Sequence, residues 1–542
     1  MSRLPLLIAG TLLVLAGAFW NNSGIESAFG RDIGSLAWGP TLFRVLLVLH
    51  GVVLIALTRL QSKRVSRPTT RNTAAWWTLS AITLVALALR LWKLNTGLWF
   101  DEVTALVDFV RPSAGIIFTS FPNQNQHMLF SLLAHAAVGV FGEHAWSLRL
   151  PAVLFGVGSI WALFLLGRRV LGAREALFAC ALMAVSYHHI WFSQNARGYT
   201  GLLFFSILAV WLWLEALERR STGWSIAFAA SIALGIWAHL TMVFVVAGIG
   251  VVYLAGLLRR DSLERSAGWG PWLGFALGGT LALQFHALAL PEFLRTALHE
   301  VSLPSEWTNP LWVVTESLRS LHVGLLGSGV LICGAAFMLF GWLRLMLRDA
   351  RAVAIMTVPA VLGGAMMMAS SHNLWPRFFF FSMGFALLIV IGGVMESAMV
   401  LRARPSWALA ACGVIVLVSA LTVPRVFSLP KQDFIGARDY AERLRTPENA
   451  IVAIGLAGVA YEKYYAPQWA IAKSGEELET LRQRYPDLAL VYTLPIELKA
   501  FHPDVWRVVE ERFETVATFP GTLGGGEVFV CRQRSNVALR KQ

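Results

Sequence analysis

The chain is dominated by apolar runs whose length approaches that of a membrane-spanning helix. A helix needs about 20 predominantly apolar residues to cross a hydrocarbon layer about 30 Å thick. About thirteen runs approach this length, at residues 5–20, 41–58, 74–92, 147–166, 176–191, 200–217, 224–239, 240–258, 271–290, 323–343, 352–371, 378–399 and 406–423. Only 14% of the 542 residues are charged, whereas soluble proteins carry about a quarter. The sequence therefore predicts an α-helical polytopic membrane protein with about 13 transmembrane helices, and it excludes an ordinary cytosolic enzyme.

Basic residues predict the orientation of these helices, because Lys and Arg concentrate in cytoplasmic loops. They follow the second, fourth and sixth runs, at 59–71, Arg168 and Arg219, whereas the alternate connections are poor in basic residues. This pattern is consistent only if residues 93–147 form one long outer loop in which the apolar stretch 127–142 lies flat at the membrane surface. We therefore expect a cytoplasmic N-terminus and an extracytoplasmic C-terminus. The formal charge of +13 mostly marks this topology, so it does not indicate a nucleic-acid partner.

The composition changes after residue 423. Residues 424–542 combine mixed charge, Pro and short apolar runs, as a small soluble α/β domain does. Expected strands lie at 450–457, 488–494 and 527–532, and expected helices at 434–445, 475–485 and 503–513. The motif GLAGVA at 455–460 lacks the spacing of a dinucleotide fingerprint, so it predicts a plain strand-to-helix turn. We expect this domain on the outer face of the membrane.

Carboxylates are essentially missing from the predicted helix interiors, and Glu215 and Glu396 fall near predicted cytoplasmic ends. A cation-coupled transporter normally needs such groups near the bilayer midplane. This absence argues against a transporter, and a lipid or polysaccharide transporter is kept as the alternative function.

The first polar cluster is LNTGLWFDEVTALVDF at 94–109, directly after the third run. A carboxylate such as Asp101, held beside aromatic side chains, can have its pKa adjusted for general-base catalysis. Asp101 and Glu102 could also help to hold a cation. The structural alternative is that both are solvated charges at a helix start, where acids are favoured.

The second cluster opens the stretch predicted to lie on the membrane. Asn125, Gln126 and His127 stand where free backbone N–H groups favour an anionic ligand. His127 could donate to a phosphate or bind a metal through a ring nitrogen. A polar helix cap explains the same residues equally well.

The third cluster, YHHIWFSQNARGYT at 187–200, forms a short outer turn. Arg197 is a cation on a side otherwise poor in basic residues, and its forked guanidinium suits bidentate phosphate recognition. Gln194, Asn195 and Tyr199 can hydrogen-bond to sugar hydroxyls.

The fourth cluster, SSHNLWPRFFFF at 370–381, places His372 and Arg377 on the same outer side. An arginine at the headgroup level can bind a lipid phosphate. Extension of the side chain towards water is the structural alternative.

Together, LRLWKLNTGLWFDE (89–102), NQHMLFSLLAHAAVGVFGEHAWSLRLPAVLFG (125–156), SQNARGYT (193–200) and WPRFFFFSMGFALL (375–388) resemble the family 39 glycosyltransferases with the GT-C fold. That group includes protein O-mannosyltransferases and lipid A aminoarabinose transferases. The resemblance covers about residues 74–400. It implies a membrane glycosyltransferase of the cell envelope, in the plasma (inner) membrane, which moves a sugar from a polyprenyl-phosphate donor to a glycan, lipid or protein acceptor on the outer (periplasmic) face.

The resemblance also implies roles for individual residues. Asp101 would be the general base that deprotonates the acceptor hydroxyl, and Glu102 would orient it or help bind a cation. Arg197 and Arg377 would hold the donor phosphate, and the transfer would invert the anomeric carbon.

Two departures bear on a metal cofactor. Relatives often carry acids where this chain has Asn125, Gln126 and Asn195. A divalent metal therefore has only Glu102 and His127 as candidate ligands here.

We expect three parts along the chain. Residues 1–73 hold two additional helices and a basic loop, residues 74–423 form the catalytic membrane core, and residues 424–542 form the soluble domain.

Overall fold

A computed structural model describes residues 3–58, 73–297, 309–370, 374–446, 449–485 and 487–534. Within these ranges, eight helical stretches are long and apolar enough to cross a membrane. They are α3 (Gly39–Leu57), α4 (Thr73–Leu91), α8 (Ala145–Val170), α11 (Tyr199–Arg219), α19 (Ser328–Arg348), α20 (Ala350–Ala369), η2 with α21 (Pro376–Val400) and the stretch Pro405–Val426, formed by α22 (Pro405–Ala420) and α23 (Val423–Val426). The chain is therefore a multi-span membrane protein, as the apolar runs predict.

Three further predicted spans are helix pairs with a sharp bend. α1 (Arg3–Phe19) and α2 (Asn22–Ala28) meet at 108°, α9 (Ala173–Ala184) and α10 (Tyr187–Ser193) at 62°, and α15 (Gly270–His286) and α16 (Leu290–Ala297) at 84°. If each pair is one span, the number of spans in the described ranges rises to eleven.

Two predicted spans are shorter than expected. α12 (Thr222–Ala238) and α13 (Met242–Leu258) have 17 residues each, which gives about 25 Å at 1.5 Å per residue. Each helix is therefore a few residues short of a full hydrocarbon layer. The predicted total of about 13 spans is reached only when both helices are counted.

α11 lies at the centre of the bundle. In the most apolar 18-residue segment of α11, 83% of the residues are buried inside the protein, whereas the corresponding figure for α19 is 11%. The buried side chains of α8, α9, α11, α12 and α21 form one core around it. The first turns of α8 and α11 therefore have fixed positions, and both begin at the end of the bundle that carries the outer loop.

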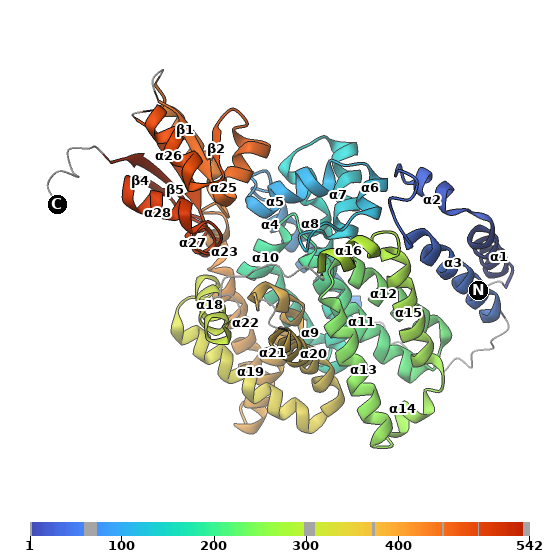
Figure 1. Ribbon diagram of the computed structural model, residues 1–542. Helices are drawn as coiled ribbons and strands as arrows, with labels where there is room; N and C mark the ends of the chain where they lie inside the picture. Colours follow the sequence, from blue (N-terminus) through green and yellow to red (C-terminus); the bar gives the residue numbers. More distant parts are fainter. Residues whose placement is uncertain are drawn as a thin grey trace.

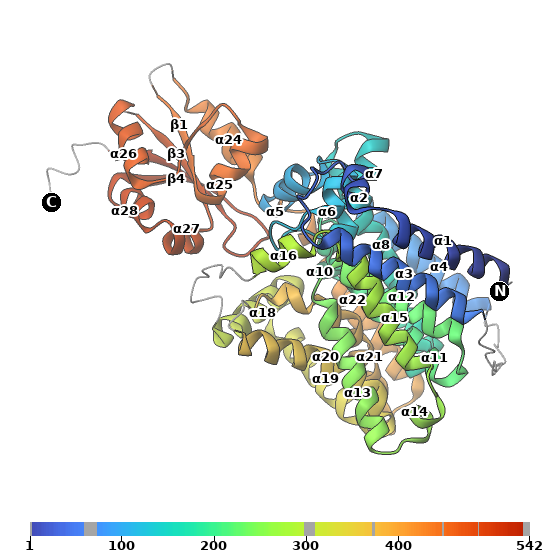
Figure 2. The ribbon, with the colours of Figure 1, turned by 45° about the vertical axis from the view of Figure 1, so that its right-hand side comes forward.

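That loop folds into four short helices: α5 (Phe100–Thr104), η1 (Ala105–Val110), α6 (Ala114–Thr119) and α7 (Met128–Phe141). α7 covers the apolar stretch predicted to lie flat. With 14 residues it is about 21 Å long, too short to cross the membrane. Figures 1 and 2 place α5, α6 and α7 at the end of the bundle that faces the C-terminal domain, away from α14 (Ser262–Ser266).

The two N-terminal helices pack against each other and against α15. A Cβ at Gly10 of α1 would lie 2.7 Å from the carbonyl oxygen of Gly51 in α3, so glycine permits the close crossing. Gln284 of α15 donates to the carbonyl oxygen of Phe43 at 3.3 Å. Further along the chain, Phe29 stacks on Phe118 of α6 with ring centroids 5.3 Å apart. The additional pair therefore also contacts the outer loop.

The carboxylates near the C-terminal ends of α11 and α21 are paired with arginines. At the C-terminal ends of α11 and α21, Glu215 bonds to Arg169 at 3.0 Å and Glu396 bonds to Arg344 at 3.2 Å. These acids lie near the ends predicted to be cytoplasmic. The N-terminal ends of these helices carry Tyr199 and, through η2 (Pro376–Ser382), Arg377.

The C-terminal domain contains a five-stranded sheet of order β2-β1-β3-β5-β4. β1 pairs in parallel with β2 and β3, and β5 is antiparallel to β3 and β4. Its elements are α24 (Phe434–Arg443), β1 (Ile451–Ile454), α25 (Gly455–Ala460), η3 (Tyr461–Tyr465), β2 (Ala470–Ala472), α26 (Gly475–Arg484), β3 (Ala489–Thr493), α27 (Pro495–Phe501), α28 (Pro503–Arg512), β4 (Phe513–Phe519) and β5 (Val528–Gln533). β1 is buried on both faces, as expected of a parallel strand covered by helices.

The predicted α/β domain is confirmed, with corrections at its boundaries. The strand expected at 450–457 ends at Ile454, because Gly455 has a φ of +55° and turns the chain into α25. GLAGVA is thus the predicted strand-to-helix turn. The helix expected over 503–513 ends at Arg512, and Phe513 begins β4. Neither β2 nor β4 is predicted by the sequence pattern.

α19 and α21 cross at backbone contact distance through glycines. A Cβ at Gly341 would lie 2.2 Å from the carbonyl oxygen of Ile389 and 2.8 Å from the Cα of Gly393. Small residues allow this kind of approach between membrane helices.

Gly341→Ala should therefore destabilise the protein by about 1–3 kcal/mol, because a helix backbone cannot move aside for a methyl group without disturbing its packing. Thermal unfolding in detergent measures this effect. Gly334→Ala is the matched control in the same helix, because a Cβ at Gly334 meets nothing within 4 Å and alanine favours helix. Equal melting temperatures for the two variants would contradict the close crossing.

Candidate active site

Asp101 and Glu102 open α5, directly after the non-helical segment that follows α4. Trp99 caps this helix, and both acids lie in its first turn, where they face the positive end of the backbone dipoles. Asp101 is 6% exposed and Glu102 is fully buried. Because consecutive residues on a helix diverge by about 100°, the two carboxylates have different neighbours.

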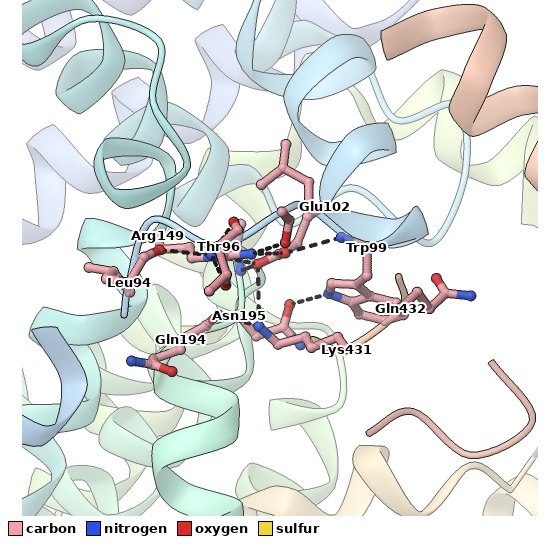
Figure 3. Close-up of polar contacts among 12 residues, drawn as sticks. Leu94, Thr96, Trp99, Glu102, Arg149, Gln194, Asn195, Lys431 and Gln432 are labelled. Atoms are coloured by element: carbon pink, nitrogen blue, oxygen red, sulfur yellow. Dashed lines mark hydrogen bonds and ion pairs between the residues drawn. The ribbon is translucent and has the colours of Figure 1, made fainter. Parts of the chain in front are cut away.

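Glu102 forms a buried ion pair with Arg149 in the first turn of α8 (Figure 3). Arg149 donates from Nε to Oε1 at 2.8 Å and from Nη2 to Oε2 at 2.5 Å. The backbone N–H of Ala196 also donates to Oε1 at 2.8 Å. Burial alone would raise the pKa of Glu102, but the charges of Arg149 and Lys431 and these hydrogen bonds hold that pKa below its usual value. Glu102 is therefore ionised at neutral pH.

Arg149 also fixes the segment that leads to α5. Its remaining N–H groups donate to the carbonyl oxygens of Leu94 at 2.7 Å, Thr96 at 2.9 Å and Gly97 at 2.9 Å. Figure 3 shows the guanidinium between this segment and Glu102. One side chain of α8 thus positions both the backbone before α5 and the acid in its first turn.

Asp101 faces two guanidiniums from distant parts of the chain. Its Oδ2 lies 3.3 Å from Nη1 of Arg377 in η2 and 3.6 Å from Nη1 of Arg197 in the turn before α11. Nη2 of Arg197 donates to Oδ1 of Asn125 at 3.1 Å. The fold therefore brings together four predicted site residues that are separated by up to 276 positions.

Three aromatic rings adjoin this cluster. His127 stacks on His239 with ring centroids 4.7 Å apart, and Tyr199 lies 5.7 Å from His127 and 5.0 Å from His239. Gly198 makes this arrangement feasible, because a Cβ there would lie 2.2 Å from the carbonyl oxygen of Ala238.

His127 is neutral in this environment. Burial, followed by the charges of Arg197, His239 and Arg377, holds its pKa well below the usual value. Its ring bonds to the backbone of Ala238 while Nε2 has no partner, so the hydrogen bonds assign the proton to Nδ1 and leave Nε2 as an acceptor. In His239, Nδ1 accepts from the N–H of Thr241 at 3.3 Å, which assigns the proton to Nε2.

Several buried nitrogens around Asp101 have no hydrogen-bond partner among the residues that the structure describes. They are Nε and Nη1 of Arg197, Nε of Arg377, Nε2 of His239 and Nδ2 of Asn195. Leaving a buried donor unpaired costs about 1–3 kcal/mol. Such a concentration of donors, three of them on guanidiniums, is suited to a ligand with several acceptor oxygens, such as a phosphate.

Three other predicted site residues form hydrogen bonds with the segments around the cluster. Gln126 donates to the carbonyl oxygen of Ile117 at 3.3 Å, and Gln194 donates to that of Trp92 at 2.7 Å. Oδ1 of Asn195 accepts from the indole N–H of Trp99 at 3.1 Å. These amides hold the loops around the cluster in place. His372 lies outside the described residues.

The sequence interpretation missed Arg149, Lys431 and the contribution of His239. Arg149 had a usable signal, because a cation inside a predicted span is expensive and is normally paired. His239 is a lone histidine at the end of a predicted span, where such a residue usually has a structural role, so it carries only a weak signal. Lys431 lies in a loop 329 residues beyond Glu102 and carries no local signal.

One of the two predicted metal ligands, Glu102, does not fit a metal site. Both oxygens of Glu102 accept from Arg149. Throughout the described ranges, no group of three His, Cys, Asp or Glu side chains is arranged to hold a metal ion. Glu102 is therefore a partner for arginine in this fold.

The buried ion pair gives a stability prediction. Arg149→Met should lower the free energy of unfolding by about 3–5 kcal/mol, because it leaves Glu102 buried without its cation. Glu102→Leu combined with Arg149→Met should recover part of that loss. Arg111→Met, which removes the exposed Arg111–Glu143 pair, should cost at most about 1 kcal/mol. Thermal unfolding of the four proteins in detergent tests this order, and equal losses for the two single variants would contradict it.

The comparisons with known proteins cover both the site and the fold. Residues 125–283 match the family model described as dolichyl-phosphate-mannose-protein mannosyltransferase. That segment contains Asn125, His127, Arg149, Arg197 and His239. The putative mannosyltransferase YkcB of Bacillus subtilis (strain 168) is 33% identical over 88 residues, which is 16% of this chain and 12% of the length of that protein.

Two solved structures match most of the chain. The oligosaccharyltransferase of Archaeoglobus fulgidus in the apo form aligns with a TM-score of 0.51 at 12% identity, over 83% of this chain and 74% of that one. ArnT from Cupriavidus metallidurans in the apo state aligns with a TM-score of 0.50 at 15% identity, over 85% of this chain and 98% of that one. At these identities the likeness concerns the fold. The chain is thus a multi-span membrane protein with the GT-C glycosyltransferase fold, and its residues 125–283 match the protein mannosyltransferase family that the sequence motifs indicate.

Proposed function

We propose that this protein is an integral-membrane glycosyltransferase that moves a sugar from a polyprenyl-phosphate donor to an acceptor hydroxyl, with Asp101 as the general base. The observation that carries the proposal is the contact of one buried carboxylate with two guanidiniums, each of which has a buried Nε without a hydrogen-bond partner among the described residues. A phosphate bound by those donors would lie beside the carboxylate. The family matched by residues 125–283 uses, by its name, a dolichyl-phosphate-linked mannose.

Arg197 and Arg377 would hold the donor phosphate, and Nε2–H of His239 would donate to it. As the bond between the sugar C1 and the phosphate oxygen breaks, negative charge develops on the leaving phosphate. Fixed donors in a buried site stabilise such a charge because they need no reorganisation. Two guanidiniums against one carboxylate also give the site a net positive charge, which favours the anionic donor.

Asp101 would accept the proton of the acceptor hydroxyl as its oxygen bonds to C1 of the sugar. The products are the glycosylated acceptor and the polyprenyl phosphate, and the proton remains on Asp101 until water removes it. A positioned general base contributes about 10²–10⁴-fold to a rate. Inversion at C1 follows from a direct attack of this kind and agrees with the resemblance of the motifs.

An apolar cavity of about 220 Å³ offers a place for part of the prenyl chain. It is lined by Leu240, directly after His239, and by Phe121, Ile236, Leu283 and Phe293. A hydrocarbon chain that leaves the phosphate site past His239 would bury its surface there.

The side of the membrane follows from the charge pattern. Arginines cluster at the ends of α8, α11 and α19 that lie opposite Asp101, for example Arg169, Arg219 and Arg348. By the positive-inside tendency, those ends face the cytoplasm. We therefore place the site and the C-terminal domain on the outer face of the plasma membrane, with residues 74–423 as the catalytic core.

Asp101→Asn tests the assignment of the base. Transfer from a radiolabelled polyprenyl-phosphate sugar should fall by about 10²–10⁴-fold, whereas the affinity for undecaprenyl phosphate should stay equal or rise, because a negative charge is removed beside the phosphate. Asp108→Asn is the matched control, since Asp108 pairs with Lys463 outside the cluster. Near-normal turnover of purified Asp101→Asn would contradict the assignment. Movement of substrate across sealed vesicles without a covalent product would instead support a transporter.

Arg197→Met and Arg377→Met test the phosphate site. Each should weaken undecaprenyl phosphate binding by about tenfold or more, because a charge-assisted hydrogen bond to phosphate contributes about 1.5–3 kcal/mol. Arg111→Met removes an arginine of the same outer loop that is paired with Glu143, and its affinity should match that of the wild type. If all three variants bind equally well, the phosphate site lies elsewhere.

A further inference from the structure

Two consecutive residues at the start of the C-terminal domain contact the segment that carries Asp101. Lys431 and Gln432 lie between α23 and α24, in a bend of the chain that is neither helix nor strand, and Figure 3 shows both side chains near Trp99. Nζ of Lys431 donates to the carbonyl oxygen of Gln194 at 2.5 Å and lies 3.8 Å from Oε1 of Glu102. Its charge also lies 5.4 Å from the ring of Trp191. The lysine side chain is only 10% exposed.

Gln432 connects α5 to the C-terminal sheet. Its Oε1 accepts from the backbone N–H of Phe100 at 3.0 Å. Its Nε2 donates to Oγ1 of Thr493, at the end of β3, at 3.1 Å, and to the carbonyl oxygen of Gly526 at 3.3 Å. The glutamine is 2% exposed, so its amide is used completely within this interface.

These contacts bracket Asp101. Gln432 binds the residue before it, and Lys431 pairs with the residue after it. α5 has only five residues, so it has little stability of its own and its first N–H groups need outside partners. The direction of the Asp101 side chain therefore depends on what holds Phe100 and Glu102.

Two further contacts dock the domain on the same loop. The hydroxyl of Tyr465 donates to the carbonyl oxygen of Leu98 at 2.6 Å. Nζ of Lys463 bonds to the carboxylate of Asp108 at 2.8 Å. The Lys463–Asp108 pair is about one-third exposed and seven residues beyond Asp101, so it contributes to docking without bracketing the base.

We infer that Lys431 and Gln432 are positioning residues for Asp101, which makes the C-terminal domain a constituent of the active site. This inference rests on the proposed function for its effect on catalysis. The C-terminal domain then holds the segment around the general base through Lys431 and Gln432, and α8 holds the same segment through Arg149.

The protonation of Lys431 makes its contact with Glu102 dependent on pH. The groups that face it are Glu102 of α5, Arg149 of α8 and Lys93 of the segment after α4, which lines the same cavity of about 240 Å³. Burial lowers the pKa of Lys431 to about 7, although Glu102 acts in the opposite direction. Below that pH the ammonium pairs with Glu102, and the pair is lost as the pH rises through about 7. The wild-type kcat should therefore decline above that pH.

The test compares Lys431→Met, Lys431→Arg and Gln432→Met in the full-length protein. Lys431→Met and Gln432→Met should lower kcat on the order of ten- to a hundredfold, as small misplacements of a catalytic group do. KM for the donor and the affinity for undecaprenyl phosphate should change by less than about twofold, because Arg197 and Arg377 are untouched. In Lys431→Met the decline of kcat above pH 7 should disappear. Lys431→Arg should keep most of kcat and shift that decline to higher pH, because a guanidinium stays charged.

Lys463→Met is the matched control for docking alone, and its kcat should stay within about twofold of the wild type. Wild-type kcat and an unchanged pH profile in Lys431→Met would overturn the inference. A loss of kcat in Lys463→Met as large as in Lys431→Met would overturn it as well, because the domain would then act only through general docking.

Amide hydrogen exchange gives a readout that does not need transfer activity. Exchange in residues 97–104 should be faster in Lys431→Met and Gln432→Met than in the wild type and Lys463→Met. If the wild type transfers no sugar from any polyprenyl-phosphate donor, the proposed function fails, while faster exchange in that segment still supports positioning. Unchanged exchange in both variants overturns the positioning inference whatever the activity.

Discussion

The ion pair between Glu102 and Arg149 is the interaction on which the rest of the site depends. It joins the outer loop to the first turn of α8, whose remaining length belongs to the core around α11. Because both side chains are fully buried, the pair keeps its charges only with near-complete hydrogen bonding. Arg149 meets this need by binding three carbonyl oxygens of residues 94–97. Because the buried guanidinium of Arg149 needs these acceptors, its hydrogen bonds fix the backbone that leads to Asp101.

The neighbouring acids consequently have different functions in the fold. Glu102 accepts hydrogen bonds from Arg149 and from the backbone N–H groups of Ala196 and Trp99, and it also pairs with Lys431, so it is a structural anion. Asp101 shares one oxygen with two guanidiniums at 3.3 and 3.6 Å and keeps the capacity to accept a proton. A short helix is a suitable carrier for this arrangement, because consecutive side chains point in directions about 100° apart. One residue can then anchor the helix while the next faces the ligand.

The sequence predicted the membrane architecture better than it predicted the residues that position Asp101. Apolar runs locate membrane helices because hydrocarbon imposes one length and one composition on all of them, and outliers such as Arg197 and Arg377 are visible against the charge pattern. α12 and α13 are too short to be distinguished from full spans by composition. β2 has three residues, and β4 has an exposed face next to a predicted helix, so neither has a clear period. The contact of Lys431 with Glu102 joins residues 329 positions apart, and no local pattern encodes it.

The balance of buried charge finally distinguishes the two ends of the bundle. At the end opposite the site, Glu215, Glu264 and Glu396 each form an ion pair with at least one arginine, so each of these carboxylates has a cationic partner. Around Asp101 the guanidiniums outnumber the carboxylate, and several of their N–H groups have no partner in the described part of the chain. Buried cations in excess of their carboxylate partners are retained only where something offsets their cost. Under the proposed function, an anionic ligand would supply what is missing, and a phosphate would provide both the charge and the acceptor oxygens for the unpartnered donors.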